Sequence, residues 1–202
     1  MQIITADQTR MIDLPGIGPC PRPVDIDRST TGFTRLKSLR IYRFLPGATI
    51  AGDSEGDEVY ILPFGGAVDM VVTGATPVQV RLSAVSGPRA LYMAPDHGYL
   101  LTPISESLVA YARAAAMGRI ACHAVPGHGD ANAEVLSFII ADLATGDALP
   151  NDSTKDRLIH VVAGSIIVDG QPLSATQTAA LAPGQPALVQ ARGPVTVLMV
   201  SA

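Results

Sequence analysis

Three carboxylates stand close together in one short acidic loop. Asp53, Glu55 and Glu58 fall within six residues of one another. Carboxylate oxygens are the ligands that hard cations such as Mg²⁺ and Ca²⁺ prefer, so this loop could hold such a cation. The loop also contains serine, glycine and a further aspartate, a composition typical of a solvated turn. We favour the solvated turn and retain the hard-cation site as an alternative.

Two residues of a later apolar segment could bind an anionic ligand. Arg157 could pair with a carboxylate through two parallel hydrogen bonds, or be a strand-end surface charge paired with a nearby aspartate. His160 lies in the middle of the apolar run 158–162. If its face of the strand lines a cavity, it could hold a carboxylate or transfer a proton; otherwise it is a core histidine bonded to a backbone carbonyl. We favour the structural interpretation for both residues.

The histidines and cysteines do not predict a metal centre or a nucleophile. A transition-metal site of three histidines and one carboxylate needs more histidine than either half of the chain contains. His123 and His128 stand in a segment rich in glycine and proline, which gives them no fixed geometry. Cys20 and Cys122 lie outside any recognisable nucleophile motif, and the sequence has no glycine-rich phosphate loop. We therefore expect no metal and no cofactor.

Short β-strands must position these side chains, because glycine and proline interrupt the chain throughout. The 19 Gly and 16 Pro residues are spread along all 202 positions. Between them apolar and polar residues alternate, as at Val78, Val80 and Leu82, which is the period of a half-buried strand. No segment has a long helical period with caps. The sequence predicts an all-β fold.

The strands form two sets that look like a repeat. Gly65 follows Gly47 by 18 residues, as Gly164 follows Gly146 (65 − 47 = 164 − 146). Such self-similarity indicates duplicated domains. We predict an N-terminal barrel over residues 1–120 and a C-terminal barrel over residues 121–202, with a connector at about 117–132.

Each set also contains the frame of a known motif. In the first half, Gly47 is followed by the acidic pair Asp53 and Glu55, then by Glu58, and then by Gly65 after six residues. This frame resembles the first motif of the cupin superfamily, in which two histidines one residue apart stand where this chain has Asp53 and Glu55. The resemblance implies small antiparallel barrels of the jelly-roll or double-stranded β-helix type.

The second half retains the same frame with different chemistry. Gly146 is followed by Asp152 and Thr154, and Arg157 stands where the family has its glutamate, before Gly164. The chain therefore resembles a two-domain cupin, or bicupin, whose metal-ligand positions hold no histidine. Residues 30–112 are further similar to the 5-deoxy-glucuronate isomerase family, in the order of segments 31–33, 39–47, 56–59 and 87–95. That family isomerises a sugar acid with a metal in its second barrel, and the second half of this chain lacks those ligands.

Composition excludes several classes of partner. Only 16% of residues are charged, the net charge is −4, and no cluster of Lys and Arg exists to neutralise phosphates, so we expect no nucleic acid. No apolar run is long enough for a membrane span, and the first residues do not form a signal peptide, so we expect a cytoplasmic protein. Pairing of sheet edges could make it a homodimer.

These observations lead to one functional expectation with two alternatives. We expect two tandem cupin-like barrels, free of a transition metal, that bind a small polar or anionic metabolite or act as a scaffold. A sugar-acid isomerase-like enzyme is the first alternative, and the hard-cation loop is the second. The ligand-binding candidates are His160, Arg157, Glu58, Glu55 and Asp53.

Overall fold

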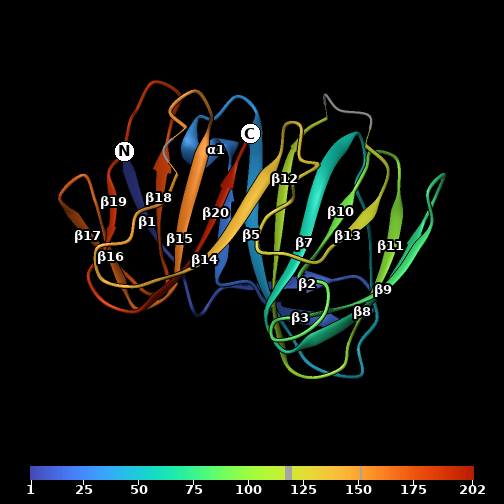
Figure 1. The fold of residues 1–202 in the computed structure, drawn as a ribbon. Coiled ribbons are helices and arrows are strands. Elements are labelled where there is room, and N and C mark those ends of the chain that lie inside the picture. The colour runs from blue at the N-terminus through green and yellow to red at the C-terminus, as the bar shows by residue number, and fades with distance from the viewer. Residues whose placement is uncertain (117–119, 151) are drawn as a thin grey trace.

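The structure is a computed structural model that describes residues 1–116, 120–150 and 152–202. As predicted, the fold is all-β: α1 (Arg28–Thr31) is the one helix within these ranges. Asp27 begins this helix because its carboxylate accepts the backbone N–H groups of Ser29 and Thr30. The strands form two cupin-like barrels side by side (Figure 1).

The first barrel pairs a six-stranded sheet with a four-stranded sheet. The order in the larger sheet is β13 (His123–Val125), β10 (Ala90–Met93), β7 (Asp57–Gly65), β12 (Ser107–Ala115), β5 (Leu36–Phe44) and β4 (Val24–Asp27). The order in the smaller sheet is β6 (Ile50–Asp53), β11 (Gly98–Pro103), β8 (Ala67–Thr73) and β9 (Val78–Ser83). A hairpin of β2 (Met11–Leu14) and β3 (Gly18–Pro21) lies beside this barrel, where the Cys20 thiol contacts the Arg43 carbonyl of β5.

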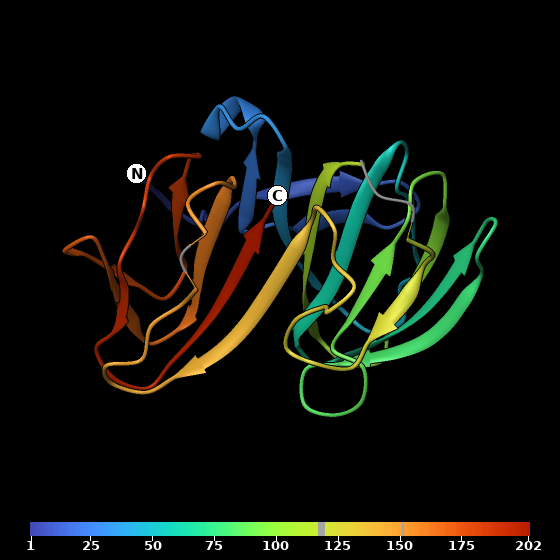
Figure 2. The same ribbon diagram turned by 45° about the horizontal axis from the view of Figure 1, so that its top comes forward.

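The second barrel is smaller. Its larger sheet has the order β1 (Gln2–Thr5), β18 (Gln177–Leu181), β15 (Arg157–Ala163), β20 (Val195–Ser201) and β14 (Ser137–Leu143). Its smaller sheet has the order β17 (Gln171–Ser174), β16 (Ser165–Val168) and β19 (Val189–Ala191). Figure 2 shows the two barrels from another side, with β14 and β20 on the flank that faces the first barrel.

Two strands pair across the boundary expected at residue 120. β1, at the N-terminus, pairs with β18 of the second barrel, with Gln2 opposite Ala180. β13, which follows the boundary, pairs with β10 of the first barrel, with Ala90 opposite Val125. Each barrel therefore receives one strand from the other's part of the sequence. Residues 117–119 of the expected connector lie outside the described residues.

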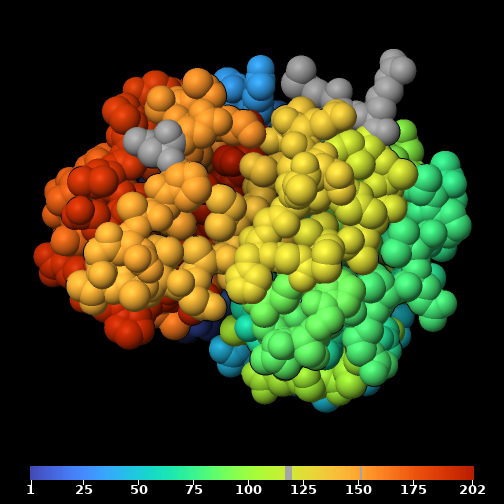
Figure 3. All heavy atoms as spheres, viewed as in Figure 1, coloured from blue at the N-terminus to red at the C-terminus, as the bar shows by residue number. Residues whose placement is uncertain are grey.

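The barrels pack through the outer faces of their larger sheets. On β12, Tyr111 and Arg113 face the interior of the first barrel. The alanines that alternate with them, Ala110, Ala112 and Ala114, therefore face the second barrel, and they are fully buried. Alanine there lets the two sheets approach closely. One apolar core consequently runs from the inside of the first barrel into the interface, where Phe138 and Leu198 join it, while a separate core fills the second barrel. On the face seen in Figure 3, atoms of the two barrels are in contact.

Matching glycines show how the two halves correspond. Gly47 and Gly146 have φ values of 89° and 90°, and Gly66 and Gly164, which directly follow β7 and β15, have φ values of 72° and 82°. A Cβ on Gly66 would lie 2.4 Å from the Glu106 carbonyl oxygen, and one on Gly164 would lie 2.5 Å from the Pro194 carbonyl oxygen. Both glycines are therefore required for the turn at the same point of each barrel.

This correspondence corrects the alignment inferred from the sequence. Gly66, and not Gly65, matches Gly164, because the loop before β7 is one residue longer than the loop before β15. β7 and β15 each have an irregularity in their pairing with the last strand of the barrel, before Gly66 and before Gly164. Glu58 therefore corresponds to Asp156, and Arg157 corresponds to Val59.

Glu58 and Asp156 hold the barrels together by reciprocal bonds. Glu58 Oε2 of the first barrel accepts the backbone N–H of Leu136, just before β14 of the second barrel (3.2 Å). Asp156 Oδ2 of the second barrel accepts three successive backbone N–H groups, of Thr34, Arg35 and Leu36, where β5 begins (3.1, 2.8 and 3.2 Å). Both carboxylates are buried. They satisfy backbone donors that the interface would otherwise leave unpaired.

Candidate functional site

A polar cavity of about 220 Å³ opens inside the first barrel. Strand β5 contributes alternate residues to its wall, Ser38, Arg40 and Tyr42, because successive side chains of a strand point to opposite faces. Strand β12, paired with β5, contributes Tyr111 and Arg113 by the same alternation. The remaining lining residues come from the hairpin, the end of β5, β6, the loop after it, β7 and β11, and are Leu14, Phe44, Ile50, Ala51, Gly52, Asp53, Glu55, Val59 and Tyr99.

Arg113 is the central cation of this cavity. Its side chain is 21% exposed, its Nη1 atom lies 3.6 Å from Glu55 Oε2 and 3.8 Å from Asp57 Oδ2, and its Nη2 atom donates to the Asp53 carbonyl. Lys37 pairs with the other oxygen of Asp57. Neither contact of Arg113 with a carboxylate is a close bidentate pair, so the guanidinium keeps capacity for a ligand oxygen.

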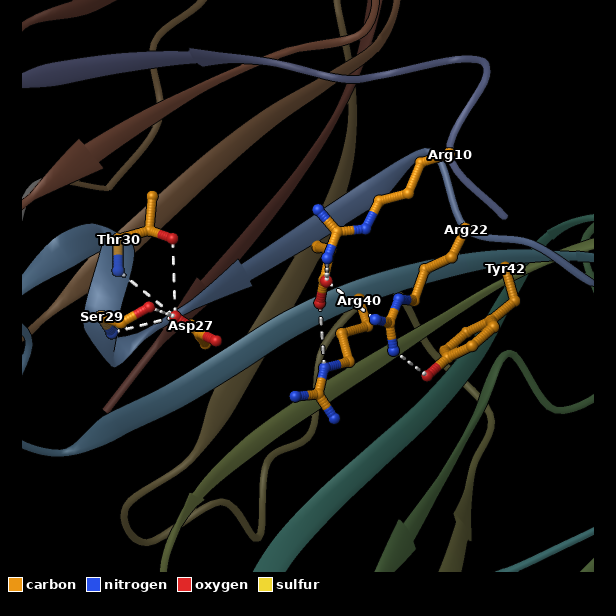
Figure 4. A network of polar contacts seen from close by, with 8 residues as sticks. Arg10, Arg22, Asp27, Ser29, Thr30, Arg40 and Tyr42 are labelled. Atoms are coloured by element: carbon orange, nitrogen blue, oxygen red, sulfur yellow. Dashed lines mark hydrogen bonds and ion pairs between the residues drawn. The ribbon is translucent and has the colours of Figure 1, made fainter. Parts of the chain in front are cut away.

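A second guanidinium, that of Arg40, is fixed at the cavity wall by a network around one carboxylate (Figure 4). Arg40 Nε donates to Asp25 Oδ1 at 3.2 Å, and Arg22 Nη2 donates to Asp25 Oδ2 at 2.8 Å. Arg10 also pairs with Asp25. Arg22 further donates to the Tyr42 hydroxyl at 3.3 Å and lies over its ring. Three cations thus share a single aspartate, which leaves positive charge beside the cavity.

Three tyrosines, Tyr42, Tyr99 and Tyr111, line the cavity. The Tyr111 ring lies edge-on to Tyr42 at 5.3 Å and 6.0 Å from Tyr99, between ring centroids. Burial raises the pKa of Tyr99 to about 12 and that of Tyr111 well above its ordinary value. Both hydroxyls therefore remain protonated donors at neutral pH. Tyr111 is 8% exposed, and its hydroxyl makes no hydrogen bond of ordinary geometry with the described residues.

Of the acidic residues that the sequence singled out, two reach this cavity and one does not. Asp53 and Glu55 line it, as Asp53 ends β6 and Glu55 follows in the turn. Glu58 faces the second barrel instead, because Asp57 and Val59 occupy the inward positions of β7. The carboxylate that points inward beside Arg113 is therefore Asp57, one residue earlier.

The donors present do not fit the metal of the fold family or the hard cation considered from the sequence. In the described part of the chain, no three His, Cys, Asp or Glu side chains are grouped as a metal site would group them. Asp53, Glu55 and Glu58 do not converge, and Arg113 and Lys37 stand among the acidic groups on the inward side. A cation there would compete with two fixed positive charges.

Arg157 lies at the mouth of the second barrel. It begins β15 on the inward face, it is 1% exposed, and its Nη2 atom donates to the Gln185 carbonyl. Burial lowers its pKa. It is thus not the surface charge that the sequence favoured, and it lies in a different barrel from Asp53 and Glu55.

His160 faces the first barrel, across the interface between the barrels. Its ring stacks on Phe64 with 6.5 Å between centroids, and its Nδ1 atom lies 2.9 Å from the Thr178 hydroxyl oxygen. Burial lowers the pKa of His160 to about 4. A neutral, buried ring with a hydroxyl partner is the behaviour of a core histidine, although its partner is a side chain and not the backbone carbonyl expected.

The connector contributes a further polar cluster. His123 Nε2 lies 2.8 Å from Asp130 Oδ2, which also accepts the Tyr60 hydroxyl at 2.6 Å. His123 Nδ1 lies 2.9 Å from the Ala121 carbonyl. These bonds attach the connector to β7 of the first barrel. His123 therefore serves a contact between segments, and its ring does not reach the polar cavity.

Comparisons with known proteins identify the architecture. No protein-family model and no curated protein matches the chain. Among solved structures, the protein Ylba from Escherichia coli is 11% identical with a TM-score of 0.78, over 99% of this chain and 90% of that one. An iolb-like protein from Salmonella typhimurium is 11% identical with a TM-score of 0.73, over 100% and 92%. A cupin 2 conserved barrel domain protein from Leptotrichia buccalis is 14% identical with a TM-score of 0.56, over 98% and 91%.

This chain has the cupin fold. The identities are too low to carry more than the fold, so the chemistry of the cavity must be argued from its own residues. No helix in the described part of this chain is long and apolar enough to cross a membrane.

Sequence reasoning missed four residues of the polar cavity: Arg40, Tyr99, Tyr111 and Arg113. They come from three strands that are far apart in the chain, and only the pairing of β12 with β5 and the closure of the barrel bring them together. A local signal was present in the strand that contains Arg40. Polar residues at Ser38, Arg40 and Tyr42 alternate with Leu39 and Ile41, which predicts one polar face on that strand.

Proposed function

We propose that the first barrel binds a small, hydroxylated carboxylate of the sugar-acid class. The observation that carries this proposal is the buried Tyr111 hydroxyl, which lines the cavity that also holds Arg113. It makes no hydrogen bond of ordinary geometry with the described residues, and its one polar neighbour among them is the Tyr99 hydroxyl. An unpaired buried hydroxyl is costly, and a ligand oxygen in the cavity would satisfy it.

The other lining groups match the parts of such a ligand. Arg113 and Arg40 can pair with its carboxylate, because a guanidinium presents several donors in a planar arrangement. Asp53 and Glu55 can accept hydrogen bonds from its hydroxyl groups, and Tyr99 can donate to its oxygens. The volume of about 220 Å³ is below the roughly 300–1,000 Å³ of pockets for drug-sized ligands, which favours a small metabolite.

A sugar-acid isomerase is the second candidate. Its support is the placement of Asp53 and Glu55 beside Arg113, since isomerisation needs a group that moves a proton next to a bound carboxylate. The sequence resemblance of residues 30–112 to the 5-deoxy-glucuronate isomerase family points the same way. Incubation with D-glucuronate in D₂O tests it: exchange of a carbon-bound proton, followed by NMR, supports isomerisation, and its absence leaves a binding protein.

Thermal unfolding with and without D-glucuronate or D-galacturonate tests the binding proposal. A ligand at 100 times its Kd should stabilise the protein by about 2.7 kcal/mol, or roughly 5–10 °C for a chain of this size. Tyrosine fluorescence gives a second readout, since the chain has no Trp and three of its five tyrosines line the cavity. D-glucose, which has the hydroxyls and no carboxylate, should have a much smaller effect.

Tyr111→Phe and Tyr92→Phe form a matched pair of variants. Both remove a buried hydroxyl that makes no hydrogen bond of ordinary geometry with the described residues. Only Tyr111 lines the cavity, whereas Tyr92 packs against Tyr60 on the outer face of the sheet. Tyr111→Phe should weaken the response to the sugar acid, and Tyr92→Phe should leave it unchanged. No response of the wild type to any sugar acid, or equal responses of the two variants, would favour a scaffold over a binding protein.

A further inference from the structure

A cavity of about 160 Å³ lies between the two barrels, on the outer faces of their larger sheets. One wall comes from β5, β7 and β12 of the first barrel, and the other comes from β15 of the second. The chain between β1 and β2 crosses this end of the interface. There the Ala6 N–H donates to the Thr176 carbonyl of the second barrel (3.0 Å), and the Asp7 N–H donates to the Pro23 carbonyl just before β4 (2.9 Å). The cavity is thus a feature of the assembled pair of barrels.

Most of its lining is hydrocarbon, contributed by Val24, Ile41, Phe64, Leu108 and Val162. Arg43 and Gln8 also line it, and both are exposed. The Arg43 Nε atom lies 3.8 Å from Glu106 Oε1. Protein interiors are packed closely and leave few spaces larger than a water molecule. A cavity of roughly 150 Å³ with aliphatic and aromatic walls takes up one benzene molecule, so the volume here matches a single six-membered ring.

His160 is the buried polar group of this lining. It is 6% exposed, and its Nδ1 atom lies 2.9 Å from the Thr178 hydroxyl oxygen. Its Nε2 atom makes no hydrogen bond of ordinary geometry with the described residues, and the protein does not enclose that atom fully. Because burial lowers the pKa of His160 to about 4, the ring is neutral at pH 7. Nε2 then offers either a lone pair or an N–H, and a ligand hydroxyl can pair with both forms.

The first barrel shows that the fold does not require an imidazole at this position. Leu62 and Ala90 stand where the second barrel has His160 and Thr178. An apolar pair therefore satisfies the same place in the frame, on the same outer face of the sheet. A polar pair that opens into an apolar cavity is better explained by a ligand with one hydroxyl than by packing.

We propose that this cavity binds a small neutral aromatic alcohol of the phenol class. The hydroxyl pairs with His160 Nε2, and the ring lies against Phe64 and the aliphatic wall. A neutral imidazole and a hydrocarbon wall select against a carboxylate, which would lose its hydration with no buried cation to pair with. The ligand class and the place both differ from those of the polar cavity. The site is therefore independent of the sugar acid proposed for the first barrel.

Titration with phenol of protein labelled with ¹⁵N in its four histidine side chains tests this site. The Nε2 signal of His160 should shift in a saturable way, whereas the signals of the other three histidines should not. Nuclear Overhauser contacts from the phenol ring protons to the methyl groups of Ile41 and Val162 should place the ligand. Both measurements use the unaltered protein.

The double substitution His160→Leu with Thr178→Ala isolates the contribution of the hydroxyl. It introduces the pair that the first barrel has at these positions and leaves the cavity apolar. The ratio of phenol affinity to toluene affinity, measured by calorimetry, should fall at least tenfold, because toluene has the ring without the hydroxyl. Tyr92→Phe is the matched control and should leave the ratio unchanged, since it removes a buried hydroxyl that does not line the cavity. Val162→Phe should fill the cavity and weaken the binding of both compounds.

Three results would overturn the proposal. They are an unmoved His160 signal at saturating phenol, Overhauser contacts to Tyr99 or Tyr111 in place of Ile41 and Val162, and an unchanged affinity ratio in the double variant. The second result would place phenol in the first barrel. If the double variant does not fold, the first two results decide. A failure of D-glucuronate to bind would count against the function proposed for the first barrel and would leave this site unaffected.

Discussion

At corresponding positions of their last strands, the first barrel carries Tyr111 and Arg113, whereas the second carries Met199 and Ser201. The strand that pairs with each continues the contrast, with Arg40 and Tyr42 on β5 but Ile139 and Ala141 on β14. The interior of the first barrel is consequently a polar cavity, and that of the second is an aliphatic core with a basic mouth.

The difference shows which parts of the cupin frame are independent of the site. The turn glycines, the irregularities in β7 and β15 and the reciprocal carboxylates are the same in both barrels. Several side chains that point inward differ, as Arg40 differs from Ile139, Tyr111 from Met199 and Arg113 from Ser201. In the first barrel the cavity residues can therefore change while the turn glycines and the reciprocal carboxylates, which lie outside the cavity, keep the frame.

Loss of a reciprocal carboxylate should have the largest effect on stability. Asp156→Ala leaves three backbone N–H groups of the first barrel without their acceptor, that of Leu36 buried and those of Thr34 and Arg35 partly buried, and should cost about 4 kcal/mol in the free energy of unfolding. Asp156→Asn should cost about half as much, because Oδ2 alone accepts these bonds and an amide oxygen can replace it. Denaturant unfolding measures both. Equal costs for the two variants would contradict the account.

Acidification should weaken the interface through His160. Its folded pKa is about 4 against an ordinary value of 6.5, so between these values the unfolded chain binds a proton that the folded chain excludes. Stability from this residue is complete above pH 6.5 and decreases as the pH falls, by about 3 kcal/mol at pH 4.

The first barrel supplies a matched variant for this prediction. Leu62 and Ala90 stand where the second barrel has His160 and Thr178. The double substitution His160→Leu with Thr178→Ala should therefore remove this part of the acid dependence while leaving the stability at pH 7 similar. Unfolding curves of both proteins between pH 7 and pH 4 that stay parallel would show that His160 does not titrate as described.

Alanine substitutions at the turn glycines should distinguish the loss of stability caused by a steric clash from the loss caused by a positive φ alone. Gly66→Ala and Gly164→Ala place a Cβ within 2.5 Å of a backbone oxygen and require a positive φ, so each should cost about 2–3 kcal/mol. Gly47→Ala and Gly146→Ala require only the positive φ, with no atom within 4 Å, and should cost about 1 kcal/mol. Thermal unfolding that ranks the two pairs in the reverse order would contradict the proposed correspondence.

Gly52→Ala should have the smallest effect on stability and a clear effect on the site. A Cβ at this position would lie 2.5 Å from the Tyr99 hydroxyl oxygen, the far end of a side chain that can turn. We expect a cost of less than about 1 kcal/mol and a reduced response to sugar acids, followed by thermal shift. An unchanged response would mean that Tyr99 does not contact the ligand.

The sequence could predict the architecture further than the site. Alternating residues such as Val78 and Val80, and the glycines Gly47 and Gly146, were sufficient for an all-β fold of two barrels. The sequence could not predict that Glu58 faces outward, because a shift of one residue turns every side chain of a strand to the other face. The loop before β7 is one residue longer than the loop before β15, so the alignment inferred from the sequence matched Glu58 with Arg157 and not with Asp156. Arg113 and Tyr111 could not be joined to Arg40 without the register of β12 on β5.

Amide chemical shifts during a titration with D-glucuronate report which barrel binds the sugar acid. We expect saturable shifts at Ser38, Arg40, Tyr111 and Arg113 of the first barrel, with their counterparts Ser137, Ile139, Met199 and Ser201 unmoved. Shifts at the second set, or no shifts in either barrel at saturating sugar acid, would contradict the claim that the polar cavity of the first barrel is the site.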